Sequence, residues 1–235
     1  MAFPTLEGTS PIFSMHPTKS LFMGFLALAM AAIAIAVCAQ QPKSAIKKSN
    51  DIGGLLHDGD ILFQSGNSEQ CEAIRLATGS EWTHCGIAFK KDGSWVVMEA
   101  VQPVKITPLS VFINRGIDRR VEIMRLEDPA HQPTAEVTQC MWNQGSRWLD
   151  KNYDIYFNWS DEELYCSELV WKVYNACTGI ELGTPLPLAS FDLTSPQVKA
   201  IMHQRYGDSI PLNEKMISPG DVHDSQFLQR VSDGK

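Results

Sequence analysis

The dipeptide Asp92-Gly93 stands between two apolar runs, Thr83–Phe89 and Ser94–Val101. Asp-Gly is typical of the two-residue turn that joins antiparallel strands, because both positions of that turn need positive φ. We therefore predict a β-hairpin here. Other strands are predicted at Ile61–Ser65, Val104–Thr107 and Arg120–Leu126. Helices are predicted at Ser68–Ala77, Pro108–Asn114, Pro133–Lys151 and Ser195–Tyr206, with a loop at Pro185–Pro187 and an extended segment at Ile217–Val222. This arrangement predicts an α+β fold with an antiparallel sheet flanked by helices.

The hairpin places two polar side chains on one face. With a two-residue turn, His84 lies opposite Val101 and Gly86 lies opposite Glu99. Glu99 is then one diagonal step from His84, and Gly86 leaves the space between them open. Cys85 points to the other face by strand alternation and is expected in the core. His84 and Glu99 are therefore a candidate base with its orienting carboxylate. The alternative is a half-exposed structural pair, and a loop of different length would separate them.

A second candidate group lies on a predicted helix, Asp161–Cys177, whose apolar residues recur at helical spacing. Ser160 with Glu163 has the pattern of a capping box at its start, and Thr178-Gly179 has the pattern of a stop. Cys166 would lie in the first turns, where the helix dipole lowers the pKa of a thiol and favours the nucleophilic thiolate. The alternative is that Cys166 is a small buried core residue.

The N-terminal segment resembles an export signal. Leu21–Val37 is an unbroken run of apolar residues and glycine, preceded by Lys19. Val37 and Ala39 stand at the third and first positions before a cut, where signal peptidase needs small residues. We predict that residues 1–39 are an export signal, residues 40–50 a tether and residues 51–235 the folded domain. A lipoprotein signal modified at Cys38 and an uncleaved membrane anchor are the alternatives. All three place the domain outside the cytoplasm, with membrane association through the N-terminal segment in the last two.

Charge and cysteine usage limit the classes of partner. The net charge of −7 argues against a nucleic-acid partner. The chain contains neither a C-x-x-C nor an H-E-x-x-H motif, so no metal and no cofactor are expected. Cys38 lies in the predicted signal, and the odd number of cysteines after it leaves at least one free thiol. Cys166 is expected to be the most reactive thiol, with Cys85 and Cys177 buried. The cysteines after the signal are Cys71, Cys85, Cys140, Cys166 and Cys177.

Four short motifs occur in a fixed order: Gly59-Asp-Ile-Leu62, Thr83-His-Cys-Gly-Ile87, Val97-Met-Glu-Ala100 and Tyr165-Cys-Ser-Glu-Leu169. With the tail Ser218-Pro-Gly-Asp-Val222 they resemble the YiiX/YebB-like cysteine hydrolases. That family has a circularly permuted papain-like fold and is related to NlpC-type cell-wall peptidases and to lecithin-retinol acyltransferase. Its histidine strand precedes its cysteine helix, as here. The resemblance covers about residues 52–232.

The resemblance implies a role for each candidate residue. Cys166 would be the nucleophile, His84 the base and Glu99 the third polar residue of a triad. Tyr165 would line the substrate pocket, and Asp60 is a second expected substrate-binding residue. The implied function is that of an exported cysteine hydrolase, a peptidase or amidase acting on cell-envelope substrates such as cell-wall peptides through an acyl-enzyme. An acyltransferase or lipid thioesterase using the same site, on an acyl substrate, is the first alternative, and a non-catalytic binding module is the second.

Overall fold

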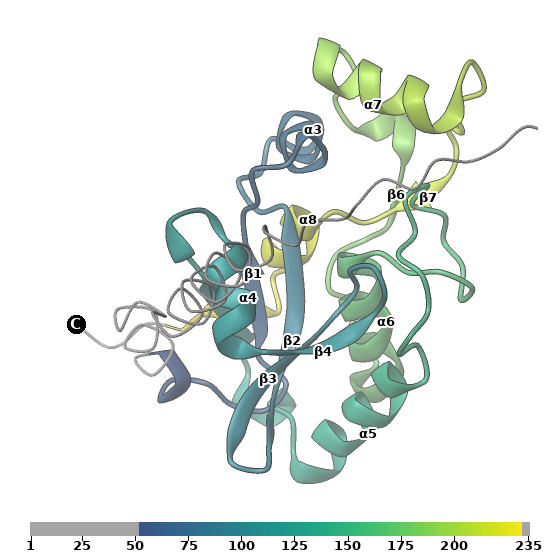
Figure 1. Cartoon of the computed structure of the whole chain (residues 1–235). Helices are drawn as coiled ribbons and strands as arrows, with labels where there is room; N and C mark the ends of the chain where they lie inside the picture. Colours follow the sequence, from purple (N-terminus) through teal and green to yellow (C-terminus); the bar gives the residue numbers. More distant parts are fainter. Residues whose placement is uncertain (1–51, 232–235) are drawn as a thin grey trace, which may run out of the picture. The chain divides into compact units, whose positions relative to one another are not determined.

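The computed structural model describes residues 52–231 (Figure 1). The predicted export signal and tether, residues 1–50, lie outside the described residues. The strands are β1 (Ile61–Gln64), β2 (His84–Lys91), β3 (Ser94–Glu99), β4 (Lys105–Pro108), β5 (Glu122–Leu126), β6 (Leu186–Pro187), β7 (Lys215–Met216) and β8 (Leu228–Arg230). The α-helices are α3 (Glu69–Thr78), α4 (Leu109–Arg115), α5 (Ala135–Ser146), α6 (Cys166–Thr178), α7 (Pro196–Tyr206) and α8 (Pro219–His223). Short 3₁₀ helices are η1 (Ile117–Arg119), η2 (Pro129–His131) and η3 (Leu188–Ser190).

Six strands form one sheet in the order β4-β3-β2-β1-β5-β8, and every neighbouring pair is antiparallel. The predicted α+β class with an antiparallel sheet is therefore confirmed. The predicted hairpin is also present, with Ile87 paired to Met98 and Lys91 paired to Ser94. Asp92 and Gly93 both have positive φ, 49° and 78°, as the two-residue turn requires.

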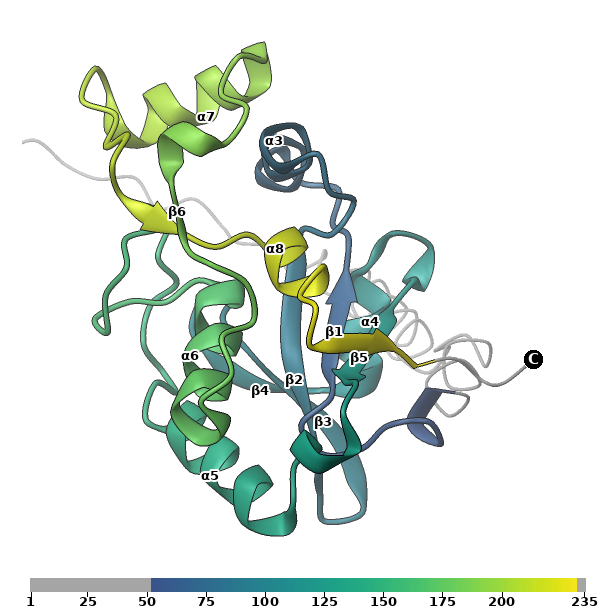
Figure 2. The same cartoon turned by 180° about the vertical axis from the view of Figure 1, so that it is seen from behind.

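Strand alternation divides the core between the two faces of the sheet. Phe63, Cys85 and Ile87 point to the face covered by α6, where they pack with Leu169 and Val173. The other face is covered by α4 and has its own buried cluster: Leu56, Leu62, Ala88, Val97, Leu109, Phe112, Ile113 and Ile123. Figure 2 shows α6 and α5 side by side on one side of the sheet. The candidate active site lies at the start of β2, next to helices from both layers, α4 and α6.

Helices α3 and α7 pack against each other away from the centre of the sheet, as both views show (Figures 1 and 2). Both helices begin as the sequence predicts, because the side chains of Ser68 and Ser195 accept hydrogen bonds from backbone amides of the first turn. Within residues 52–231, no helix combines the length and the apolar character that a membrane crossing requires.

Several predicted boundaries were wrong. Helix α6 begins at Cys166 and not at residue 161, with Tyr165 as its N-cap and no side-chain capping bond. Its predicted stop is confirmed, because Gly179 has φ 71° and its amide bonds to the Asn175 carbonyl. Helix α5 is shorter than the predicted Pro133–Lys151. The predicted loop at 185–187 contains β6, and the predicted extended segment at 217–222 contains α8.

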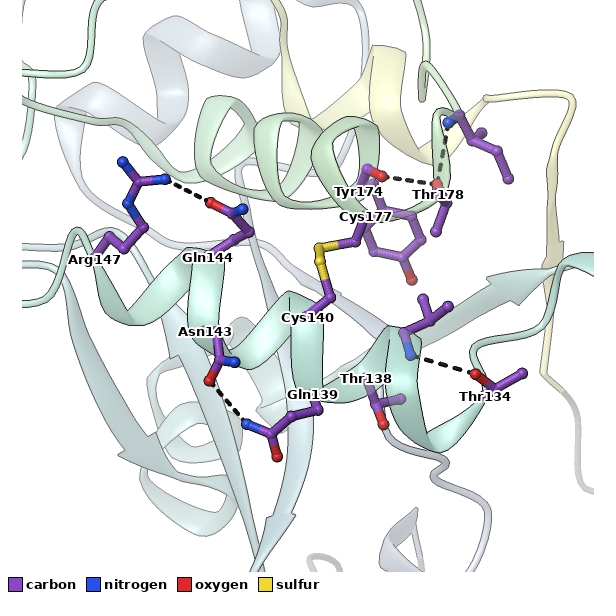
Figure 3. The surroundings of a disulfide bond; sticks show 12 residues. Thr134, Thr138, Gln139, Cys140, Asn143, Gln144, Arg147, Tyr174, Cys177 and Thr178 are labelled. Carbon is purple, nitrogen blue, oxygen red and sulfur yellow. Dashed lines mark hydrogen bonds between the residues drawn. A yellow bond between two sulfur atoms is a disulfide. The ribbon is translucent and has the colours of Figure 1, made fainter.

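A disulfide joins the two helices on the α6 side of the sheet (Figure 3). Cys140 of α5 and Cys177 of α6 are bonded, with their Cα atoms 5.8 Å apart. The expectation that Cys177 is a buried thiol is therefore corrected. Among the described residues Cys71, Cys85 and Cys166 are free, which agrees with the predicted presence of at least one free thiol.

Removing this cross-link should destabilise the protein. The two cysteines are 37 positions apart, and closing such a loop restricts the unfolded chain by an amount worth about 2–4 kcal/mol. The double variant Cys140→Ser, Cys177→Ser should lose about that much free energy of unfolding in chemical denaturation. Reduction should lower the midpoint of the wild type to that of the double variant and leave the variant unchanged. A wild type insensitive to reduction would contradict the cross-link.

Candidate active site

Cys166 is the first residue of α6 and is buried, with 3% of its surface exposed. The amides at the start of a helix have no partner within the helix and carry the positive end of its dipole. The sequence placed Cys166 in the first turns of a longer helix. The observed start moves the thiol to the helix terminus itself, where stabilisation of a thiolate is strongest.

His84 and Glu99 face each other as the hairpin register predicts. His84 begins β2, and its Nε2 lies 2.6 Å from Oε2 of Glu99, the last residue of β3. The Glu99 side chain is fully buried, and the His84 side chain is 15% exposed. The imidazole also lies 5.7 Å from the ring of Phe112, which belongs to α4. The pair is thus more buried than the half-exposed pair that the sequence allowed as an alternative.

Two residues that the sequence analysis missed complete the surroundings of Glu99. Thr107 of β4 donates a hydrogen bond to Oε1, and Nη2 of Arg115 lies 2.5 Å from each carboxylate oxygen. Burial opposes ionisation of Glu99. The hydrogen bond and charge of His84 outweigh it, with help from Thr107 and Arg115, and lower the pKa of Glu99 to about 2. The β3–β4 register was the only signal that could have indicated Thr107, and nothing in the sequence indicated Arg115.

The electrostatics of Cys166 and His84 favour an ion pair. A hydrogen bond from the Cys85 side chain and the charge and hydrogen bond of His84 hold the pKa of Cys166 well below its usual range, against the effect of burial. Burial alone would lower the pKa of His84. The negative charge of Cys166 and the hydrogen bonds to Cys166 and Glu99 raise it to about 10. Near neutral pH these shifts correspond to a thiolate beside an imidazolium.

Cys85 contacts the predicted core and, in addition, lies next to Cys166. It is fully buried in the core cluster on the α6 face, as strand alternation predicts. Because α6 crosses that face, Cys85 also neighbours Cys166, and burial together with Cys166 raises the pKa of the Cys85 thiol. Cys85 therefore keeps its proton while Cys166 loses its own.

The two expected substrate-binding residues have different surroundings. Tyr165 is buried beside Cys166 at the edge of a cavity, and its hydroxyl accepts a hydrogen bond from the amide of Ile217, 3.1 Å away. Asp60 is buried in an ion pair with Arg125, with both N–O distances 2.7 Å. Asp60 stands just before Ile61, the first residue of β1, which pairs with Ile87. His84 pairs with Gln64 at the other end of that strand. The expectation that Asp60 binds substrate is therefore corrected, because the length of β1 separates it from the site.

A cavity of about 90 Å³ opens beside Cys166. Its walls come from α3, α7, the first residues of α6 and the segments around residues 153–157, 188–193 and 216–219. Most of the lining side chains are apolar, among them Ala73, Ala77, Phe157, Val198 and Met202. No sequence pattern indicated this cavity, because its walls come from segments far apart in the chain.

Comparison with known proteins agrees with this geometry. The sequence model of a family described as "Permuted papain-like amidase enzyme, YaeF/YiiX, C92 family" matches residues 55–232. The chain is 41% identical over 174 residues to the uncharacterized protein YiiX of Escherichia coli K12, covering 74% of this chain and 85% of that protein. A crystal structure of yiiX from Escherichia coli O157:H7, described as a metalloprotein, superposes with a TM-score of 0.71 at 40% identity, covering 75% of this chain and 96% of the other.

The description of that Escherichia coli protein as a metalloprotein raises the question of a metal site in the present chain. Among residues 52–231, no three His, Cys, Asp or Glu side chains are grouped so that they could hold a metal ion. These residues therefore do not fit a metal site, and the chemistry below uses protein side chains. The match over residues 55–232 and the 41% identity show the predicted permuted papain-like fold and the cysteine peptidase or amidase class. The chain belongs to the YaeF/YiiX family of permuted papain-like amidases.

Proposed function

We propose that this chain is an exported cysteine amidase in which Cys166, His84 and Glu99 form the catalytic triad. The observation that carries the proposal is the chain of contacts from the buried Glu99 carboxylate to His84 and from His84 to a thiol at a helix start. Nucleophile, base and orienting group are the three parts that thiolate catalysis needs. Their joint presence argues against a non-catalytic binding module.

The reaction follows from the ion pair. The Cys166 thiolate attacks the carbonyl carbon, and the backbone N–H of Cys166 at the start of α6 stabilises the resulting oxyanion. Imidazolium His84 gives its proton to the leaving amine as the C–N bond breaks, which leaves a thioester on Cys166. Neutral His84 then takes a proton from water, whose oxygen attacks the thioester. The acid product leaves and the thiolate–imidazolium pair is restored.

Export is supported by two independent features. Residues 1–39 have the pattern of an export signal, and the Cys140–Cys177 disulfide belongs to the kind of bond that persists in oxidising compartments. The substrate would then be a component of the cell envelope. The sequence allowed two classes of substrate, cell-wall peptides and acyl compounds.

Thiol labelling tests the assignment of the nucleophile. Because the pKa of Cys166 is depressed, Cys166 should be present as the reactive thiolate at about pH 5.5, and iodoacetamide should alkylate it before Cys71. Peptide mapping by mass spectrometry reads out the site of modification. In the His84→Ala variant the preferential alkylation of Cys166 should require a higher pH, because the imidazolium that stabilises the thiolate is gone. Faster labelling of Cys71 in the wild type would contradict the proposal.

The acyl-enzyme offers a direct test of turnover. Cys166→Ser should still bind substrate but cannot form the thioester, whereas the wild type mixed with an envelope extract and quenched in acid should carry an added acyl mass on Cys166. Absence of any Cys166-linked adduct and of Cys166-dependent hydrolysis would overturn the proposed function.

A further inference from the structure

Arg115 is a charged residue to which the proposed reaction gives no role. It is the last residue of α4, and its side chain is 37% exposed, whereas the Glu99 side chain that it contacts is fully buried. Its Nη2 lies 2.5 Å from both carboxylate oxygens, so the two charges are in direct contact. A buried carboxylate needs a compensating cation, and Arg115 supplies one from the solvent side.

Three elements hold the Glu99 carboxylate in one orientation. The Thr107 hydroxyl of β4 donates to Oε1, His84 of β2 lies 2.6 Å from Oε2, and Arg115 of α4 contacts both oxygens. A charged donor that contacts both oxygens resists rotation of the carboxylate. Arg115 therefore helps to keep Oε2 directed at Nε2 of His84.

The position of Arg115 is fixed against the neighbours of His84. Gln64 pairs with His84 across β1 and β2. Gly116 follows Arg115 and packs so closely on Gln64 that an added Cβ would lie 2.9 Å from Oε1 of that side chain. Phe112, one turn earlier on α4, lies 5.7 Å both from the His84 ring and from the Arg115 guanidinium. The end of α4 is thus packed on the imidazole and on its cross-strand partner.

Arg115 also changes the effect of Glu99 on His84. Nitrogens of both cations contact the same atom, Oε2, so they share the negative charge of one carboxylate. A nearby like charge disfavours the protonated imidazole, so Arg115 limits the rise of the pKa of His84, which stands at about 10. That limit favours catalysis, because His84 must give its proton to the leaving amine and a general acid works best with a pKa near the working pH.

The other titratable groups around the pair do not replace Arg115. Cys166 of α6 adds a negative charge beside the imidazole, and Cys85 keeps its proton. Lys105 lies opposite the triad carboxylate on β4, but it is exposed and forms no ion pair within residues 52–231. In the described part of the chain, Arg115 is the cation besides the imidazolium that contacts this carboxylate.

We propose that Arg115 is a positioning residue of the active site, which holds the Glu99 carboxylate against His84 and offsets part of its charge so that the imidazolium can release its proton to the leaving amine. The proposal rests on Cys166, His84 and Glu99 being the triad. Arg115 acts through the carboxylate and the imidazole and not on the substrate itself. Its loss should therefore slow the departure of an amine and spare the attack of the thiolate.

Two substrates with one acyl group separate this role from a purely structural one. The probes are the ethylamide and the nitrophenyl ester of N-acetylalanine, compared by kcat/KM because this constant reports the acylation step. The amine needs a proton from His84 to leave, whereas nitrophenolate leaves without one. Arg115→Gln should lower kcat/KM for the amide about tenfold and change that for the ester less than about twofold. Arg115→Lys restores a cation and should recover most of the amide activity.

The pH–rate profile gives a second signature. Without the positive charge of Arg115, the imidazolium of His84 should persist to higher pH, so the alkaline limb for the amide should move to higher pH in Arg115→Gln. This direction is opposite to the one expected for Glu99→Gln, which removes the negative partner of the imidazolium. A variant that only loosened the fold would not move the limb in this direction.

Arg125→Gln is the matched control. Arg125 contacts both oxygens of the buried Asp60 carboxylate at 2.7 Å, as Arg115 contacts both oxygens of Glu99, but it does so at the far end of β1. Its loss should reduce stability without changing the ratio of amide to ester kcat/KM or the pH–rate profile. The folded fraction of each variant, measured by circular dichroism, accompanies every comparison.

Proton NMR of the His84 Nε2–H group gives a readout that needs no turnover. The signal is assigned by its loss in His84→Ala, and a proton held against the buried Glu99 carboxylate should exchange slowly with water. Arg115→Gln should shift or broaden this signal, because the carboxylate is then free to rotate. Arg125→Gln should leave the signal unchanged.

Each outcome decides the inference. Equal losses for amide and ester with an unchanged Nε2–H signal, wild-type kinetics of Arg115→Gln, or the same effect from Arg125→Gln would overturn it. If the wild type hydrolyses neither probe through Cys166, the proposed amidase fails on its own, and the NMR signal alone supports or overturns the role of Arg115 at the contact between His84 and Glu99.

A second variant covers the case in which Arg115→Gln does not fold. Arg115→Lys keeps the charge but loses the planar guanidinium that contacts both oxygens. It should shift the Nε2–H signal of His84 and leave the ester kcat/KM unchanged. An unshifted signal in this folded variant would overturn the inference.

Discussion

Replacing Cys166 by alanine should lower kcat by about 10⁴-fold or more, because the thiolate forms the covalent bond to the substrate and no other described group can take its place. His84→Ala should cost a similar factor, since it removes both the stabilisation of the thiolate and the proton donor for the leaving amine. The double variant should be no slower than the worse single variant, because the two residues act as one unit. Steady-state kinetics on an amide substrate supplies the measurement.

The control for this experiment is Cys71→Ala. Cys71 is free and half-buried on α3, and it is outside the lining of the cavity, so its loss should leave kcat and KM unchanged. Circular dichroism and chemical denaturation would confirm that each variant is folded. A Cys166→Ala protein that retains wild-type kcat would show that the nucleophile lies elsewhere.

Glu99→Gln should lower kcat by about 10- to 1000-fold without abolishing it, which overlaps the lower part of the range of about 10²- to 10⁴-fold that acid–base groups contribute. The carboxylate orients the imidazole and helps to raise the pKa of His84 to about 10. Without it the imidazolium loses its proton at lower pH, so the alkaline limb of the pH–rate profile should move to lower pH. The thiolate is already formed in the wild type, which makes this loss smaller than that for His84 itself.

A matched control exists in the same sheet. Glu122 is a buried carboxylate that lies 2.9 Å from Nε2 of His223, but neither residue lines the cavity beside Cys166. Glu122→Gln should therefore leave the rate and the pH–rate profile unchanged. If Glu99→Gln also left both unchanged, the third residue of the triad would have to be another group, and the position of Asp60 at the far end of β1 excludes it from that role.

The Glu99 variant must also be checked for stability, because the same carboxylate stabilises the fold. Its pKa is lowered from 4.5 to about 2 in the folded protein. A depressed carboxyl pKa stabilises the native state at pH above the unfolded value, and that contribution is lost as the pH falls from about 4.5 towards 2. Kinetic comparison near neutral pH therefore needs the folded fraction of both proteins measured at that pH.

The local part of the site followed from the sequence. The Asp92-Gly93 turn sets the register of β2 against β3, and alternation then places His84 and Glu99 on one face. Both rules act over neighbouring residues of one hairpin, so no distant part of the chain is needed to apply them. The stop of α6 at Gly179 has the same local origin, since glycine adopts the left-handed conformation there without strain.

The start of α6 shows where local rules fail. Ser160 and Glu163 have a capping pattern, yet residues 159–163 form bends and no helix. Leu164 forms a parallel bridge with Tyr153, and its carbonyl accepts from the amide of Asp154 at 3.1 Å. These bonds come from a segment about ten residues earlier and exclude helical geometry, so that the helix can begin only after them.

The sequence by itself thus determined the hairpin, the α+β class, the pair of His84 and Glu99 and, through four motifs, the family. Tertiary structure alone decided that Cys166 sits at the first position of α6 beside β2, that Arg115 and Thr107 surround Glu99, that Cys140 bonds to Cys177, and that α3 and α7 enclose an apolar cavity. Each of these joins segments far apart in the chain. Their geometry depends on how helices pack on the sheet, and periodicity and turn chemistry carry no information about that packing.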